Sequence, residues 1–411
     1  MLGDRSIPGP AAAALGLVVA VLPLRVGLAS VFPLASHPAL GHGAGIGPLA
    51  ALDLVVLGIS LRLAMRWLRP MRRPTLGPAA LGIAIVVGAA ATVRAGYGDT
   101  AFLRLGAYLT MVGLAATIAR PEESLAAVRS FVGVAVGQAV AALVGVTDTI
   151  ATGLPLGRYI GTYGDPFQFG IAMAAAALIV AEAPRMAGIG GRIRWPLVAF
   201  LLVALLGSNT RGAWGATLVA GIAIIALRQQ RTRSQPWLRF LFGFILGASL
   251  VSLAAAVTIA APALGLNPVS TRIRIDSITD TWRFFVQNPL SPQGLGNYPA
   301  QLPAYNTILA LSVALTPLFA LALAVFAITS VQSASDLAER GLFGALVAFC
   351  AATLTENIVY AGSAATVSWL LLSGLAVSLR STPIFEYAGS ERRTRERAPI
   401  GPALTPERTL L

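Results

Sequence analysis

Residues 76–95 read LGPAALGIAIVVGAAATVRA, and Arg94 is the only charged side chain in this stretch. A helix of about 20 apolar residues is long enough to cross the roughly 30 Å hydrocarbon core of a bilayer. The preceding residues 66–74 read RWLRPMRRP, which combines positive charge, proline and a tryptophan. That combination is typical of a loop beside the end of a membrane-spanning helix. The sequence therefore predicts a transmembrane helix over residues 76–95.

Comparable apolar runs recur along nearly the whole chain and predict an all-α, polytopic membrane protein with about twelve transmembrane helices. The first run is expected to remain in the protein, because no small-residue cleavage pattern of a signal peptide follows it. The expected spans are 11–35, 46–65, 76–95, 100–119, 125–150, 167–183, 195–208, 212–228, 238–262, 304–329, 341–358 and 363–379.

The composition excludes an ordinary water-soluble fold. Of the 411 residues, 56% are hydrophobic and 11% are charged, and the mean hydropathy is +0.76, whereas a soluble domain carries about 25% charged residues. We expect one transmembrane domain over residues 1–380 and a mobile cytoplasmic tail over 381–411, because the tail lacks apolar periodicity.

All 30 basic residues are arginines, and the predicted spans divide them unequally between the two sides of the membrane. Arg25 and Arg104 fall inside spans, and six arginines fall on one side: Arg94, Arg158, Arg211, Arg272, Arg274 and Arg283. The remaining arginines fall on the other side, which the positive-inside rule makes cytoplasmic, together with both termini. The net charge of +13 therefore reports topology and does not indicate nucleic-acid binding.

Cysteine and histidine are too scarce for common metal sites. The single cysteine, Cys350, excludes an intrachain disulfide, and the only histidines are His37 and His42. We expect neither a metal nor an organic cofactor.

One connection, residues 263–303 between the ninth and tenth spans, is much longer than the others and is expected to be extracytoplasmic. Long loops in compact proteins usually carry function. Within it, residues 271–287 place Ile275, Ile278, Trp282 and Phe285 three or four apart, which predicts an amphipathic helix. Such a helix can lie on a membrane surface.

The six outer arginines run against the positive-inside tendency and point to a shared anionic ligand. Guanidinium groups bind phosphate through two parallel hydrogen bonds, so arginines at the interface can hold the pyrophosphate of a polyprenyl carrier whose tail stays in lipid. The alternative is that they extend to lipid headgroups. Arg211 is the most tightly placed, because a very short turn separates its two flanking spans.

Four motifs together resemble the O-antigen ligase and polysaccharide polymerase superfamily. They are Gly161 to Gly170 (GTYGDPFQFG), Ser208 to Ala213 (SNTRGA), the run from Trp282 through Asn288-Pro289-Leu290 to Gly294-Leu295-Gly296, and Tyr305-Asn306, where the family usually has His-Asn. The resemblance covers roughly residues 155–310 and is supported by the order of the motifs and their expected membrane side.

The resemblance implies transfer of a glycan from undecaprenyl pyrophosphate to an acceptor glycan or glycolipid on the outer face of a bacterial inner membrane. Arg211 matches the family arginine of the turn motif, and Arg274 or, less well, Arg283 matches the arginine before the loop tryptophan. Both would contact pyrophosphate. We place Arg158, Asp165, Arg272, Asp276 and Asn306 among the substrate-binding candidates and Tyr305 among the catalytic ones.

Tyr305 departs from the family pattern at the histidine expected to activate the acceptor hydroxyl. A tyrosine with a pKa of about 10 is a poor base near neutral pH. Arginine stabilisation of the leaving pyrophosphate with acceptor positioning can suffice, or Asp165, Asp276 or Asp280 can act as base. For Asp276 and Asp280, ion pairing with a loop arginine is the structural alternative.

The sequence therefore favours a membrane glycosyltransferase of the ligase or polymerase type, and the missing histidine favours the polymerase. A twelve-helix transporter or flippase of a lipid or anionic solute is the alternative from another class, with the outer arginines lining a vestibule. A catalytically inactive relative that binds the lipid carrier is the third.

Overall fold

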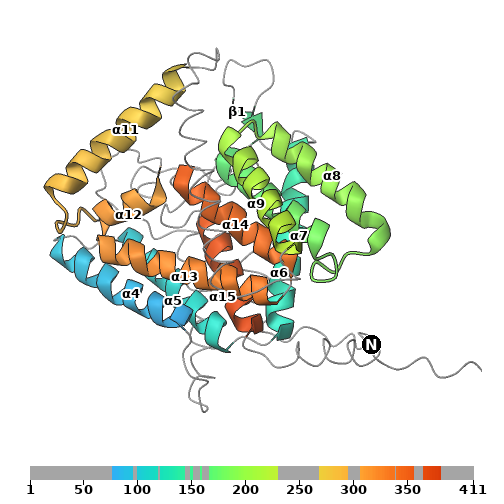
Figure 1. The fold of residues 1–411 in the computed structure, drawn as a ribbon, viewed down its shortest axis with the longest axis horizontal. Helices are drawn as coiled ribbons and strands as arrows, with labels where there is room; N and C mark the ends of the chain where they lie inside the picture. Colours follow the sequence, from blue (N-terminus) through green and yellow to red (C-terminus); the bar gives the residue numbers. More distant parts are fainter. Residues whose placement is uncertain are drawn as a thin grey trace, which may run out of the picture.

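In the computed structural model of the chain, the described residues are 76–95, 100–118, 121–143, 149–150, 158–159, 166–229, 268–294, 306–337, 339–355 and 364–380 (Figure 1). The expected spans 11–35, 46–65 and 238–262, the tail 381–411, and the site candidates Asp165 and Tyr305 lie outside them.

The described part of the chain is helical apart from one two-residue ladder. Its elements are α4 (Leu76–Arg94), α5 (Thr100–Ile118), α6 (Pro121–Leu143), β1 (Thr149–Ile150), β2 (Arg158–Tyr159), α7 (Pro166–Glu182), α8 (Gly191–Gly207), α9 (Arg211–Gln229), α11 (Pro268–Gln287), α12 (Thr307–Ala314), α13 (Pro317–Asp336), α14 (Arg340–Thr355) and α15 (Ala364–Arg380).

Four of these helices are long and apolar enough to cross a membrane: most or all of α4, α6, α9 and α13. Shorter apolar helices lie in α5, α7, α14 and α15. Exposed leucine, isoleucine and valine side chains on α4, α8, α9 and α13 are what a lipid-facing surface requires, because hydrocarbon has no tendency to exclude them. The expected membrane protein is therefore supported in its helical architecture, with four candidate spans in the described residues.

Two groups of helices share one core. Helices α4, α5, α13 and α15 pack on one another, as do α7, α8, α9 and α14, and the two groups meet through α13, α14, α15 and α7 (Figure 1). Helix α7 is buried along most of its length and carries the run Ala174 to Ala177. Small residues let neighbouring backbones approach closely. At Gly341 of α14, an added Cβ would lie 2.9 Å from Ala183 Cβ.

Contacts between helix ends show that α8 runs opposite to α7 and α9, and that α14 runs opposite to α13 and α15. The last turn of α7 meets the starts of α8 and α14 and the end of α9, and the end of α13 meets the end of α15. We call this side of the bundle the Glu182 end. The start of α7, the α8–α9 turn and ladder strand β2 meet at the opposite side, which we call the Arg211 end.

The prediction of one span over 304–329 is wrong, because this stretch forms two helices. Helix α12 ends at Ala314, Thr316 is extended, and α13 begins at Pro317. Proline has no N–H and is favoured in the first turn of a helix, where that N–H would have no partner. The Thr316 side chain accepts a hydrogen bond from Phe319 N at 3.2 Å, so it caps the new helix.

The predicted span 125–150 also ends earlier than expected, because α6 stops at Leu143. Thr149 and Ile150 instead pair with Tyr159 and Arg158 as an antiparallel ladder. The residues after Leu143 read VGVTDTI, and glycine and β-branched residues are weak helix formers. This ladder brings Arg158 and Tyr159 to the Arg211 end.

Residues 268–294 are the described part of the expected loop 263–303, and most of them form helix α11. The predicted amphipathic helix is thus confirmed, and Asn288-Pro289 follow its last residue as expected. In Figure 1, α11 lies crosswise to α4, α8, α9, α13 and α14, beyond their ends at the Arg211 side. It packs chiefly on α12.

Candidate functional site

The turn between α8 and α9 consists of three residues, Ser208, Asn209 and Thr210, so the expectation of a very short turn here is confirmed. Ser208 Oγ donates to the Leu205 carbonyl at 2.6 Å and lies 2.8 Å from Thr210 Oγ1. Asn209 adopts a positive φ of 48°, a conformation that asparagine tolerates better than most residues. The short hydroxyl contacts and the αL residue fix the path of the chain into α9.

Trp214, one turn into α9, holds the new helix to the one before it. Its Nε1 donates to the Leu205 carbonyl at 3.2 Å, and its backbone N donates to the Thr210 carbonyl at 3.2 Å. The last carbonyls of a helix otherwise have no partner within it. The end of α8 and the start of α9 are therefore fastened together at Leu205.

Arg211 is the first residue of α9 and is exposed. Within the described part of the chain, its guanidinium has no hydrogen bond or ion pair. The first N–H groups of a helix lack partners and carry the positive end of its dipole, so an anion beside Arg211 meets two favourable fields. Among the described residues, no protein ion pair has to break before this position binds phosphate oxygens.

Gly170 brings the first two motifs of the resemblance into contact. An added Cβ at Gly170 of α7 would lie 2.7 Å from both Ser208 Oγ and Thr210 Oγ1, and 3.0 Å from Ala213 Cβ. Those hydroxyls are already committed to the turn, so they cannot move freely. The absence of a side chain at Gly170 is what lets α7 support the Arg211 turn.

Tyr159 supports the same turn from the other side. An added Cβ at Gly207 would lie 2.0 Å from Tyr159 Cδ2, so the ring covers the end of α8. Arg158 precedes Tyr159 in β2, so its backbone also lies at the Arg211 end of the bundle. Sequence reasoning missed both Gly170 and Tyr159 as supports, because each acts through a contact distant in the sequence.

Arg272 and Arg283 of α11 differ from Arg211 in having carboxylate neighbours on the same helix. Arg272 Nε lies 3.8 Å from Asp276 Oδ2, and Arg283 Nη1 lies 3.4 Å from Asp280 Oδ1. Ion pairing, the structural alternative for Asp276 and Asp280, is therefore present. All four side chains are more than half exposed, so the pairs are weak.

Position 274 lies on a different face of α11 from these two ion pairs. It lies three residues before Ser277 and seven before Thr281, and both of those side chains are buried. Residues with that spacing share a helix face. Among the described residues, no ion pair or hydrogen bond joins α11 to Arg211, so the structure does not unite the two predicted arginine groups.

Asn306 has a structural role that the motif did not predict. Its side chain accepts from Leu309 N at 3.0 Å and so caps α12, while its Nδ2 donates to the Leu354 carbonyl at the end of α14 at 3.2 Å. On the opposite end of α12, Gln293 N and Gly294 N donate to the Val313 and Ala314 carbonyls. The third and fourth motifs therefore meet around α12.

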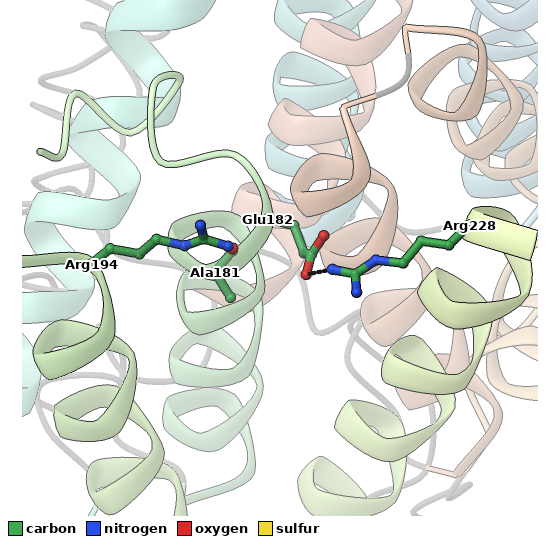
Figure 2. A network of polar contacts seen from close by, with 4 residues as sticks. All are labelled: Ala181, Glu182, Arg194 and Arg228. Atoms are coloured by element: carbon green, nitrogen blue, oxygen red, sulfur yellow. Dashed lines mark hydrogen bonds and ion pairs between the residues drawn. The ribbon is translucent and has the colours of Figure 1, made fainter. Parts of the chain in front are cut away.

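The Glu182 end shows how this protein uses arginine for structure. Figure 2 shows Arg194 and Arg228 reaching the last turn of α7 from opposite sides, where Arg194 donates to the Ala181 carbonyl and Arg228 pairs with Glu182. Positive side chains are favourable at a helix C-terminus. At the same end, Arg380 pairs with Asp336 at 2.9 Å.

The side chain of Arg129 of α6 also lies at the Glu182 end, where its Nε donates to the Met186 carbonyl at 3.3 Å. Glu339 lies nearby: burial raises the pKa of its carboxyl group, and the Arg185 guanidinium acts in the opposite direction.

Searched against known protein families and against curated proteins, the sequence matches none of them.

Proposed function

We propose that this chain is a membrane glycosyltransferase of the O-antigen ligase or polymerase type, with a polyprenyl-pyrophosphate-linked glycan as donor. The observation that supports it best is Arg211: an exposed arginine on a fixed three-residue turn, at a helix N-terminus, without a protein partner in the described residues. Guanidinium recognises phosphate bidentately. The contact of Gly170 with this turn joins two motifs of the resemblance in space.

In the proposed reaction an acceptor hydroxyl oxygen attacks the anomeric carbon of the donor sugar. The bond from that carbon to the phosphate oxygen breaks, and the carrier pyrophosphate leaves with the electron pair. Arg211 stabilises the charge that grows on the leaving oxygens. The hydroxyl proton passes to a carboxylate or to water. Arg274 is the preferred second arginine, because it matches the family arginine before the loop tryptophan better than Arg283 does.

Tyr305 is assigned a positioning role, because acting as a base at pH 7 would require its pKa to fall by several units. The next residue, Asn306, caps α12 and joins it to α14. Tyr305→Phe is expected to keep most of the activity.

The donor test uses purified full-length protein in liposomes with a lipid-linked oligosaccharide donor, measuring both donor binding and glycan product. Arg211→Ala should abolish both, and Arg211→Lys should recover only part, because a point charge loses the bidentate geometry. Arg192→Ala is the matched control, since Arg192 is also an exposed arginine in the first turn of a helix, but at the Glu182 end. Full product formation by Arg211→Ala would overturn the proposal.

The same assay separates the alternatives. Donor binding that depends on Arg211 but yields no product with any acceptor would indicate an inactive carrier-binding relative. Arg211-dependent movement of the intact donor between leaflets would indicate a transporter or flippase.

We further propose that the Glu182 end faces the cytoplasm of a bacterial inner membrane, with both chain termini, and that the Arg211 end faces outward. The support is the arginine distribution. In a Cys350→Ala background, a cysteine placed at Ser291 should react with a membrane-impermeant maleimide in intact spheroplasts, whereas one at Arg192 should react only after lysis. The opposite pattern would reverse the orientation.

A further inference from the structure

Helix α11 presents three different surfaces around its axis. Ser277 and Thr281 are buried, at 8% and 0% exposure, on the face toward the protein. Along a second face lie four exposed apolar side chains: Ile275, Ile278, Trp282 and Val286.

A third face carries two ion pairs, Arg272 with Asp276 and Arg283 with Asp280. Their side chains are 52% to 86% exposed, so this face is in water. A helix of this length, with separate apolar and charged faces that both lie open, has the pattern of an interfacial helix.

The placement of α11 in the bundle agrees with that pattern. Helices that cross a bilayer lie along its normal, and α11 lies crosswise to α4, α8, α9, α13 and α14 beyond their Arg211 ends (Figure 1). A helix in this position runs along the plane of the membrane surface.

Exposed tryptophans also lie near helix starts at both ends of the bundle. Trp214, in the first turn of α9 at the Arg211 end, is 37% exposed with its indole N–H bonded to Leu205. Trp195, near the start of α8 at the Glu182 end, is 60% exposed beneath Arg194. Exposed tryptophans at both ends of spanning helices are typical of the two interfaces of a bilayer.

We infer that α11 is a membrane-surface helix whose apolar face, Ile275, Ile278, Trp282 and Val286, is inserted among the phospholipids of the leaflet at the Arg211 end. The charged face of α11 remains in the water of the headgroup region, and the face that carries Ser277 and Thr281 packs on the protein. This inference goes beyond the proposed function and does not depend on it, because it concerns lipid contact and not the chemistry of a donor.

The direct test is spin labelling of the full-length protein in liposomes. In a Cys350→Ala background, single cysteines at Ile278, Val286 and Asp280 receive a nitroxide label, and collisions with oxygen and with a water-soluble nickel chelate are measured. Oxygen concentrates in lipid and the chelate in water. We expect the oxygen-to-nickel collision ratio at positions 278 and 286 to be several times that at position 280.

Two results would overturn the inference. Equal nickel access at positions 278 and 280 would place the apolar face in water. Protection of position 278 from both agents would mean that protein covers it, either another part of this chain or a second copy. Asp280→Cys is the matched control within the same helix, and size-exclusion chromatography of each labelled protein shows whether it is folded.

Replacing the apolar contact provides a second measurement. Trp282 is one of the exposed apolar residues and packs on Phe285 with ring centroids 5.6 Å apart. In an Ile278→Cys label background, Trp282→Glu should lower the oxygen-to-nickel ratio at position 278, whereas Asp280→Asn should leave it unchanged. An unchanged ratio in Trp282→Glu would contradict insertion of this face.

Discussion

The two ends of the helix bundle use arginine differently. At the Glu182 end, Arg194, Arg228 and Arg380 each meet a carbonyl or carboxylate on another helix. At the Arg211 end, Arg211 has no partner among the described residues. The ion pairs that Arg272 and Arg283 make in that part of the chain are with exposed carboxylates of their own helix. A cross-helix pair stabilises the fold, whereas an unpaired arginine costs little to keep in water and is free for a ligand. The difference between the ends therefore separates arginines with a structural role from those proposed to bind the donor.

The largest expected effect comes from disturbing the support of Arg211. Gly170→Ala places a Cβ 2.7 Å from Ser208 Oγ and Thr210 Oγ1, so the turn must shift. Such overpacking costs about 1–3 kcal/mol of stability, and a displaced Arg211 should reduce donor binding at least as strongly as Arg211→Lys. Gly215→Ala is the control, since nothing lies within 4 Å of its added Cβ. Wild-type donor binding by Gly170→Ala would show that the turn need not be fixed.

Asn306 should give the next largest effect, since it makes two contacts. Asn306→Ala loses the α12 cap, at about 1 kcal/mol, and the hydrogen bond to Leu354. Asn306→Asp keeps an acceptor for Leu309 N but loses the donated bond. Thermal unfolding in detergent should rank the proteins as wild type, then Asn306→Asp, then Asn306→Ala. Equal melting temperatures for Asn306→Asp and Asn306→Ala would show that the α12 cap does not stabilise the protein.

At the Glu182 end, we expect a loss of stability without a loss of binding. Arg228→Ala removes the partner of Glu182, whose side chain is 14% exposed, while Arg228 itself is 47% exposed. Solvent weakens such a pair, so the cost should be about 1 kcal/mol. Glu182→Ala combined with Arg228→Ala should cost less than the sum of the single changes. A fall in donor binding with Arg228→Ala would mean that an arginine at the Glu182 end also affects the donor, which would contradict the proposed difference between the two ends.

The sequence predicted most of the local structure but little of the long-range packing. The starts of α4, α9 and α14 lie within two residues of the predicted ones, because each follows from the pattern of apolar residues. The break at Thr316-Pro317 was missed although a capping threonine before proline is a helix start signal. Apolar residues continue on both sides of this break, so hydropathy alone predicted a single span. The approach of Gly170 to Ser208 cannot be derived from local patterns, because which segments meet is decided by the packing of the whole bundle.

The smallest expected effect concerns the carboxylates of α11 and tests whether either is a catalytic base. Asp276 is 65% exposed and lies 3.8 Å from Arg272 one turn earlier, and Asp280 is 52% exposed beside Arg283. Exposed pairs of this kind contribute about 0.5 kcal/mol or less, and a general base must reach the proton that it removes. Asp276→Asn and Asp280→Asn should therefore change both the melting temperature and the rate of glycan transfer very little. If α11 lies on the membrane surface, its carboxylates keep one face of the helix hydrated and take no part in the reaction. The double substitution should therefore also retain activity. A rate that falls a hundredfold in one single variant, with donor binding and melting temperature unchanged, would instead identify that aspartate as the base and move the reaction to α11.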